Sequence, residues 1–373
     1  MIEVKNKMTM LPPLTDRRYS NKMSAEKKVL LGCGIGCGTI TILVLIAIGF
    51  GVWWLFSPEV QVPTNRILNA GSSAAFRLED ISRNQDVMRL ISDISRETQR
   101  IKQNNMPDLP VYLQKFKKYF ESQQDPAKFI ELFVPKEATA SVSIDEKGNA
   151  VFVIAANFGK GTRIVKIFLN TVFEKNEDLK DNKISTRYGD LFLFDRRNDW
   201  NGDKSRQNIL GFYKGTIIFG NDYKSALSAL DRLADGNNTG KLNEALSDPF
   251  YRLGRNGCLA YGVLDGALLK NPEYRIGLFK GELGTEMKKA WISLDSLSSE
   301  KGIVNLHIEW NNKDFAVKAN EEIEKLKPDW INKARQNGFD MEIMNSLNDE
   351  QTNIRFQVNN LKDSLIHLIQ NNN

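Results

Sequence analysis

The chemically densest stretch of the chain is a short charged run that ends in tryptophan. Residues 195–200 read Asp-Arg-Arg-Asn-Asp-Trp. A guanidinium group forms paired hydrogen bonds with a carboxylate or phosphate, and an indole ring offers a face against which a cation or sugar can stack. Arg196, Arg197 and Trp200 are therefore candidates for ligand binding. The competing interpretation is a polar hairpin loop whose charges are solvated.

A second motif matches a phosphate-binding loop only in part. Gly159-Lys160-Gly161-Thr162 lies between an expected strand and an expected helix. A P-loop requires G-x-x-x-x-G-K-[ST], in which the lysine is followed directly by a hydroxyl residue. Here Gly161 separates the lysine from the threonine, and Ile154 stands where the first glycine belongs. We therefore expect a strand-to-helix turn with Thr162 near the helix cap.

The sequence predicts no metal site, no cofactor and no catalytic residue. His307 and His367 are the only histidines, and neither lies in an H-E-x-x-H or zinc-type spacing. Because His307 alternates with apolar residues in an expected strand, an outward-facing or hydrogen-bonded ring is the better interpretation. The chain also lacks a G-x-S-x-G nucleophile elbow and an Asp-x-Asp pair for a nucleotide-sugar metal.

An uncharged run at residues 29–56 indicates that these side chains belong to a membrane-anchored protein. The run exceeds the roughly 20 residues that a helix needs to cross a bilayer core. Lys27 and Lys28 precede it, and Trp53 and Trp54 lie at its end, where an interfacial aromatic belt belongs. A cleaved signal peptide would have a shorter apolar stretch and a small-residue cleavage site. We therefore expect a single transmembrane helix that contacts the lipid bilayer.

The orientation of this helix follows from its flanking charges. Residues 1–28 are rich in Lys and Arg, whereas residues 57–64 contain neither. The positive-inside rule then predicts a cytoplasmic N-terminus and an extracytoplasmic position for residues 57–373. Within the run, the spacing of Gly32 and Gly36 would allow a close helix–helix contact. The alternative is that glycine is simply common in membrane helices.

Composition excludes two classes of protein. The net charge is +5, but seven Lys and Arg against three acidic residues lie within residues 1–28, so the remainder is nearly neutral. A basic groove is therefore not indicated, and no nucleic-acid partner is expected. Cys258 is the only cysteine after the apolar run, which excludes a disulfide-stapled module. We interpret it as a buried strand cysteine, since a nucleophile would need a neighbouring base.

The spacing of apolar residues predicts an α+β fold. Helical spacing is followed by alternating runs separated by turn signals such as residues 145–149, which indicate antiparallel hairpins. Because the order helix, hairpin, helix occurs twice, we expect antiparallel sheets with flanking helices in two related halves. The expected organisation is a cytoplasmic basic tail at 1–28, a transmembrane helix at 29–56, a stem at 57–84, a helical segment at 85–135, a first α+β half at 136–246 and a second at 247–373.

Two stretches together resemble a known family. Residues 211–222 form a strand, a Lys-Gly turn, a second strand and a helix start, which leads into the helix at 225–230. Residues 246–253 then contain Asp-Pro-Phe and precede a strand that ends at Asp265. This order resembles a family of uncharacterised, membrane-anchored bacterial proteins over roughly residues 135–370. The resemblance implies a protein of the bacterial cell envelope and supplies no catalytic residue.

The sequence thus predicts a single-pass protein of the bacterial inner membrane with an extracytoplasmic binding or scaffolding module. Its expected partner is an envelope protein or a lipid. The alternative is an envelope hydrolase that uses carboxylates. A third interpretation is a eukaryotic type II membrane protein, for which the glycosylation pattern Asn237-Asn238-Thr239 is the indication.

Overall fold

The computed structural model describes residues 60–79, 81–102, 134–158, 161–175, 182–194, 208–238, 240–269 and 281–371, all of which belong to one compact unit, Phe56–Asn373. The expected membrane helix at 29–56, with its flanking Lys27, Lys28, Trp53 and Trp54 and its Gly32 and Gly36, lies outside these ranges. Within the described ranges, no helix combines the length and the apolar character that a membrane crossing requires.

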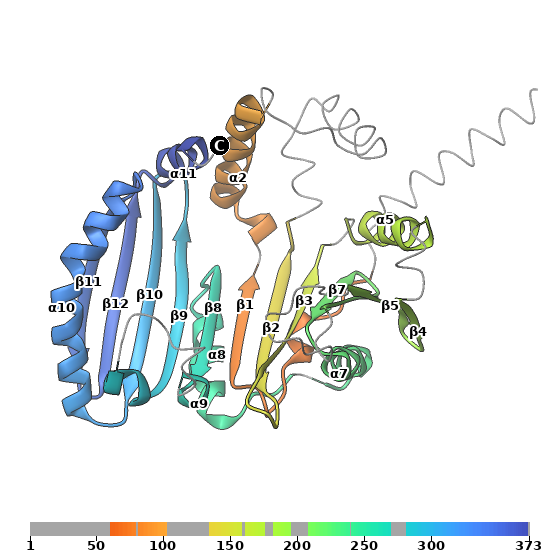
Figure 1. Cartoon of the computed structure of the whole chain (residues 1–373), viewed down its shortest axis with the longest axis horizontal. Helices are drawn as coiled ribbons and strands as arrows, with labels where there is room; N and C mark the ends of the chain where they lie inside the picture. Colours follow the sequence, from red (N-terminus) through yellow and green to blue (C-terminus); the bar gives the residue numbers. More distant parts are fainter. Residues whose placement is uncertain are drawn as a thin grey trace, which may run out of the picture. The chain divides into compact units, whose positions relative to one another are not determined.

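The described part is built on one antiparallel sheet, which confirms the expected α+β class (Figure 1). Across the sheet, the described strands follow the order β11-β12-β10-β9-β8-β1-β2-β3-β7-β6-β5-β4. Their bounds are β1 (Ala74–Glu79), β2 (Glu137–Ile144), β3 (Ala150–Asn157), β4 (Lys183–Thr186), β5 (Gly189–Phe194), β6 (Asn208–Tyr213), β7 (Thr216–Gly220), β8 (Ala260–Asp265), β9 (Met287–Leu297), β10 (Lys301–Trp310), β11 (Asp340–Asn348) and β12 (Gln351–Asn359).

Helices pack on both faces of this sheet. The α-helices are α2 (Gln85–Lys102), α5 (Gly161–Lys175), α7 (Tyr223–Ala234), α8 (Glu244–Arg255), α9 (Gly266–Leu269), α10 (Lys313–Gln336) and α11 (Leu361–Asn371), and the 3-10 helices are η1 (Thr64–Ile67), η2 (Ile81–Arg83) and η3 (Gly281–Thr285). Side chains alternate between the two faces along each strand. The buried cluster of α7 contains Val153, and that of α8 contains Ala75. Ala75 and Val153 both pair with Ser141 of β2, so the two clusters lie on the same face of the sheet. The clusters of α5 and α10 contain Phe212 and Ile308, which belong to the opposite face.

Several of the described helices begin at side-chain caps that the sequence encodes. Asp222 accepts a hydrogen bond from the Ser225 backbone N–H before α7, as expected from the sequence. Asn243 and Asn312 make the same bond before α8 and α10. Such caps satisfy a backbone donor that the first helical turn leaves free.

The structure differs from the expected stem at residues 57–84. Ile67, Leu68, Ala74 and Ala75 are buried, and β1 pairs with β2 on one side and with β8 on the other. Pro63 and the Gly-Ser-Ser turn both precede this core strand, and these turn signals favoured the interpretation of the stretch as a stem.

The strand order is the same on the two sides of the β1–β8 pair. Outward from β8 come β9, β10, β12 and β11, and outward from β1 come β2, β3, β7 and β6. On each side a helix, α10 or α5, follows the second strand of the first hairpin. The β4–β5 hairpin extends the side of β1 by two further strands.

Candidate functional site

The described residues that the sequence singled out do not form a shared site. Arg196, Arg197 and Trp200 lie outside the described residues. Thr162 is buried in the first turn of α5, and its hydroxyl donates to the Gly215 carbonyl at 3.0 Å. That bond ties α5 to the β6–β7 turn, which agrees with the expected strand-to-helix turn.

Cys258 has the character of a structural cysteine. Its side chain is buried, and its Sγ lies 3.5 Å from Asp295 Oδ1. Burial, followed by the negative charge of Asp295, raises the pKa of the Cys258 thiol. Because the thiolate is the nucleophilic form, this environment opposes reactivity.

His307 is held in a polar sheet surface. Its ring stacks on Trp291 with 5.5 Å between ring centroids, and its Nδ1 lies 2.5 Å from Asn353 Oδ1. Asn305 is its neighbour on the same face and donates to Asp295. These bonds satisfy the polar groups within the chain, so His307 is hydrogen-bonded, as the sequence suggested.

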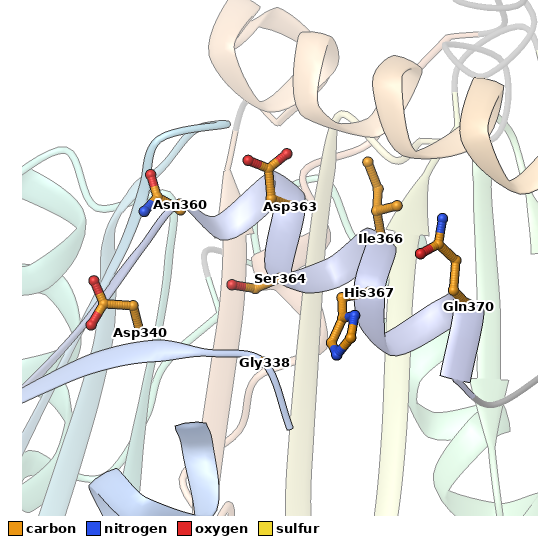
Figure 2. Close-up of a pocket in the computed structure, with 8 residues that line it drawn as sticks. All are labelled: Gly338, Asp340, Asn360, Asp363, Ser364, Ile366, His367 and Gln370. Carbon is orange, nitrogen blue, oxygen red and sulfur yellow. The ribbon is translucent and has the colours of Figure 1, made fainter. Parts of the chain in front are cut away.

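His367 lines a shallow hollow of about 550 Å³ beside α11. Figure 2 shows that Asp363 and Ile366 point toward α2, whereas His367 points toward Gly338. Asp340, from the start of β11, and Asp363 therefore do not converge on one point. Within the described ranges, no group of three His, Cys, Asp or Glu side chains is arranged to hold a metal ion. The hollow has the polar lining of an open surface.

Two carboxylates lie side by side where β1 meets β2. Glu79 and Glu137 are direct cross-strand partners in the register. Arg77 contacts both, with Nε 2.8 Å from Glu79 Oε1 and Nη2 3.3 Å from Glu137 Oε2. Tyr261 also donates to Glu79 at 2.9 Å, and burial raises the pKa of its hydroxyl.

Glu137 continues this network into the core. Its Oε1 accepts from the Thr64 backbone N–H at 2.8 Å and from Asn157 Nδ2 at 2.9 Å. Asn157 in turn donates to the Val62 carbonyl. Both glutamates thus bind partners within the chain, which joins the ends of β1 and β2. These contacts compete with any role of the two carboxylates in acid–base chemistry.

A second polar hollow, of about 360 Å³, lies beside α7. Lys224, Arg232 and several serines line it. The Arg232 guanidinium donates to the Ile67 carbonyl at 2.9 Å and to Ser228 Oγ at 2.8 Å, and burial lowers its pKa. Groups of the chain itself therefore occupy much of the hydrogen-bonding capacity of the Arg232 guanidinium.

The most distinctive surface is an apolar strip on the face that carries α5 and α10. Its side chains are half-buried, and none belongs to the four buried clusters of the described residues. Phe152 and Phe219 contact each other with 5.7 Å between ring centroids. We define the apolar strip as Phe76 and Leu78 of β1, Ala140 and Val142 of β2, Phe152 and Ile154 of β3, and Phe219 of β7.

The register explains why this face is apolar across several strands. Phe76 stands opposite Ala140, and Ala140 stands opposite Ile154. On the other face the same strands carry Arg77 and Thr139. The alternation in Ala74–Glu79 is a period-2 signal that could have identified β1 and its two strip residues, Phe76 and Leu78, from the sequence.

No family model matches this chain, and no curated protein matches its sequence. Weakly similar solved structures include crystal forms I and IV of TP0453. Form I has a TM-score of 0.41 and 10% sequence identity, with 83% of this chain and 98% of that chain covered. Form IV has a TM-score of 0.40 and 9% identity, with 83% and 97% covered. Similarity at this level carries no conclusion about function.

Proposed function

We propose that this chain is a single-pass membrane-anchored protein whose extracytoplasmic domain binds an amphipathic helix of another protein in the bacterial cell envelope. The uncharged run at 29–56 and its flanking charges support the anchor and the orientation. The apolar strip is the observation that supports the binding role. Partly exposed apolar side chains that adjoin one another across four strands form a contiguous apolar surface, which is typical of an interaction site.

The dimensions of the strip favour a helix as its occupant. From β1 to β7 the strip crosses three strand spacings of about 4.8 Å, which is about 14 Å. A helix with its side chains is about 10–12 Å wide. The same face already carries α5 on one side of the strip and α10 on the other. One further helix therefore fits the width between them.

An envelope hydrolase is the alternative. The paired Glu79 and Glu137 are the observation in its favour, because two neighbouring carboxylates are the minimum for glycosidase chemistry. Arg77 contacts both carboxylates, and Glu137 also accepts two partly buried hydrogen bonds. These contacts favour the binding role over the enzymatic one.

We also propose that the two sides of the sheet are related halves. The identical strand order on each side of the β1–β8 pair and the matching placement of α5 and α10 support this proposal. On this view the first half begins at η1 and contains β1, and the second begins at α8 and contains β8. These boundaries assign residues 64–84 of the expected stem, together with the expected helical segment at 85–135, to the first half.

The binding role is tested by photo-crosslinking in intact membranes. A benzophenone amino acid at Phe152 lies in the strip, and Val151 is a matched control on the opposite face of the same strand with similar exposure. We expect position 152, and not 151, to crosslink a protein segment whose apolar residues recur at helical spacing. The change Ile154→Gln should weaken that crosslink while the melting temperature stays close to that of the parent chain.

Three outcomes would contradict the binding role: adducts with lipid alone, crosslinks only within the chain, or the same adduct from both positions. The anchor is tested separately by protease treatment of spheroplasts. Digestion of residues 57–373 without lysis is expected. Protection until lysis would refute the proposed orientation.

A further inference from the structure

The edge of the described sheet at β11 is long and open, and its exposed side chains complement those of an identical strand paired beside it. Among the described strands, β11 pairs with β12 alone, over nine residues without a register shift. An open edge of this kind is a template for a further strand, and proteins usually block it with lysine, proline or a bulge. β11 reads Asp-Met-Glu-Ile-Met-Asn-Ser-Leu-Asn. It has no lysine, proline or bulge, and its charges, Asp340 and Glu342, lie within its first three residues.

The opposite edge of the sheet shows the contrast. There β4 has only four residues and begins with Lys183. A short edge that carries a lysine discourages further pairing. Among the described strands, the two edges of the sheet therefore differ: β4 is short and carries a lysine, whereas β11 is long and carries none.

Exposed apolar side chains gather on this edge. Met344 is 49% exposed and Leu347 is 38% exposed. They are two of the five large hydrophobic residues that are exposed in the described part of the chain. Because they lie on opposite faces of the strand, one neighbouring strand would cover both.

We propose that β11 pairs antiparallel with β11 of a second copy of this chain, about a two-fold axis at Met344. This register uses all nine residues and places Met344 opposite Met344 of the copy. Asp340 then faces Asn348, and Glu342 faces Ser346. No acid meets an acid, which matters because like charges directly opposite each other destabilise a pair of strands.

The other face of the same register is also complementary. Leu347 would face Met341, which packs against the buried cluster under α10. The interface is isologous: Leu347 of one copy meets Met341 of the other, and Met341 of the first meets Leu347 of the second. Two twelve-stranded sheets would then join into one continuous sheet.

A set of single-cysteine variants tests the register directly. They are made in the full chain with Cys33, Cys37 and Cys258 replaced by Ala, in detergent, and treated with a short bis-maleimide. In the proposed register residue 344 lies about 5 Å from its counterpart. Residue 346 is displaced from its own counterpart by four residues, about 14 Å.

We expect Met344→Cys to give a crosslinked dimer and Ser346→Cys alone to give none. A mixture of Glu342→Cys and Ser346→Cys chains should give a dimer. Equal crosslinking of both single variants, or none from Met344→Cys, would overturn the proposal.

A second measurement does not depend on crosslinking. Met344→Lys places a charge on an exposed position, so the fold should be kept while the edge is blocked. Sedimentation should show a dimer for the parent chain and a monomer for this variant, with similar melting temperatures. A parent chain that is monomeric, or a variant that remains dimeric, would refute the pairing.

Discussion

Removal of the Glu137 carboxylate should destabilise the domain by an amount that the network around it allows us to work out. Two donors converge on Oε1, the buried Thr64 N–H and Asn157 Nδ2. A hydrogen bond to a charged group contributes about 1.5–3 kcal/mol, and a buried donor left unpaired costs about 1–3 kcal/mol. Asn157 keeps its bond to the Val62 carbonyl, and Arg77 keeps Glu79. We therefore expect Glu137→Ala to lower the free energy of unfolding by about 3 kcal/mol.

The variant Glu137→Gln distinguishes the two hydrogen bonds to Oε1 from the ion pair with Arg77. Its amide oxygen can occupy the Oε1 position and still accept both hydrogen bonds. Only the contact with Arg77 is lost, and that ion pair is partly exposed, with 17% and 24% of the two side chains accessible. A partly exposed pair contributes about 1 kcal/mol or less. The expected loss for Gln is therefore about a third of that for Ala.

The assay is urea unfolding of the full chain in a mild detergent, followed by tryptophan fluorescence. The exposed Glu300 provides a matched control, since Glu300→Ala should change the free energy of unfolding by less than about 0.5 kcal/mol. If Ala and Gln at position 137 destabilised equally, the bonds to Oε1 would contribute nothing and the structural role of Glu137 would be refuted.

Three further changes test other features of the fold. Gly338→Ala should lower the free energy of unfolding by about 1 kcal/mol or more, because φ is +81° and the new methyl group would meet the His367 ring; an unchanged urea midpoint would contradict this. Asp222→Ala should cost about 1 kcal/mol through loss of the α7 cap, and Asp222→Asn should restore most of it in the same assay. The raised pKa of the Cys258 thiol means that its contribution to stability is fully present below the ordinary thiol pKa and is lost as pH rises through the raised value. Iodoacetamide should accordingly modify Cys258 far more slowly in the folded chain than in urea at pH 8.5, as read by mass spectrometry, and equal rates would refute its burial.

Local signals allowed much of the fold to be predicted. Residues 145–149 and Lys214-Gly215 marked hairpin turns, and the structure places β2–β3 and β6–β7 on either side of them. Asp222 marked the start of α7. Each of these signals lies within a few residues of the feature that it determines, so it could be identified without knowledge of the tertiary structure.

Elements that depend on distant partners were missed. β11 has few β-branched residues, and its strand conformation is set by its full-length pairing with β12. α10 continues through Pro328 to Gln336, where the proline alone would favour an earlier end of the helix. A proline inside a helix removes a backbone hydrogen bond. Beyond it, Trp330 packs near Phe356 of β12, a contact that supports the last turns of the helix.

The polar network and the apolar strip could not be predicted from spacing in the sequence. Glu79 and Glu137 become neighbours only through the β1–β2 register, and Phe152 meets Phe219 only through the β3–β7 register. A shift of one residue in either pairing would move every side chain to the other face. Register is a tertiary property, so the sequence could indicate the types of side chain but not which of them become neighbours in space.

The central position of β1 also determines when the sheet can be completed. Ala74 pairs with Leu264, and β1 is synthesised long before β8. Pairings between such distant segments close large loops, which makes folding slow. Until residue 265 has left the ribosome, one side of β1 has no partner strand, and the growing chain is exposed to aggregation. Chains that stop before β8 should therefore depend on chaperones. Chains that extend past Asp265 should become protected from aggregation in one step.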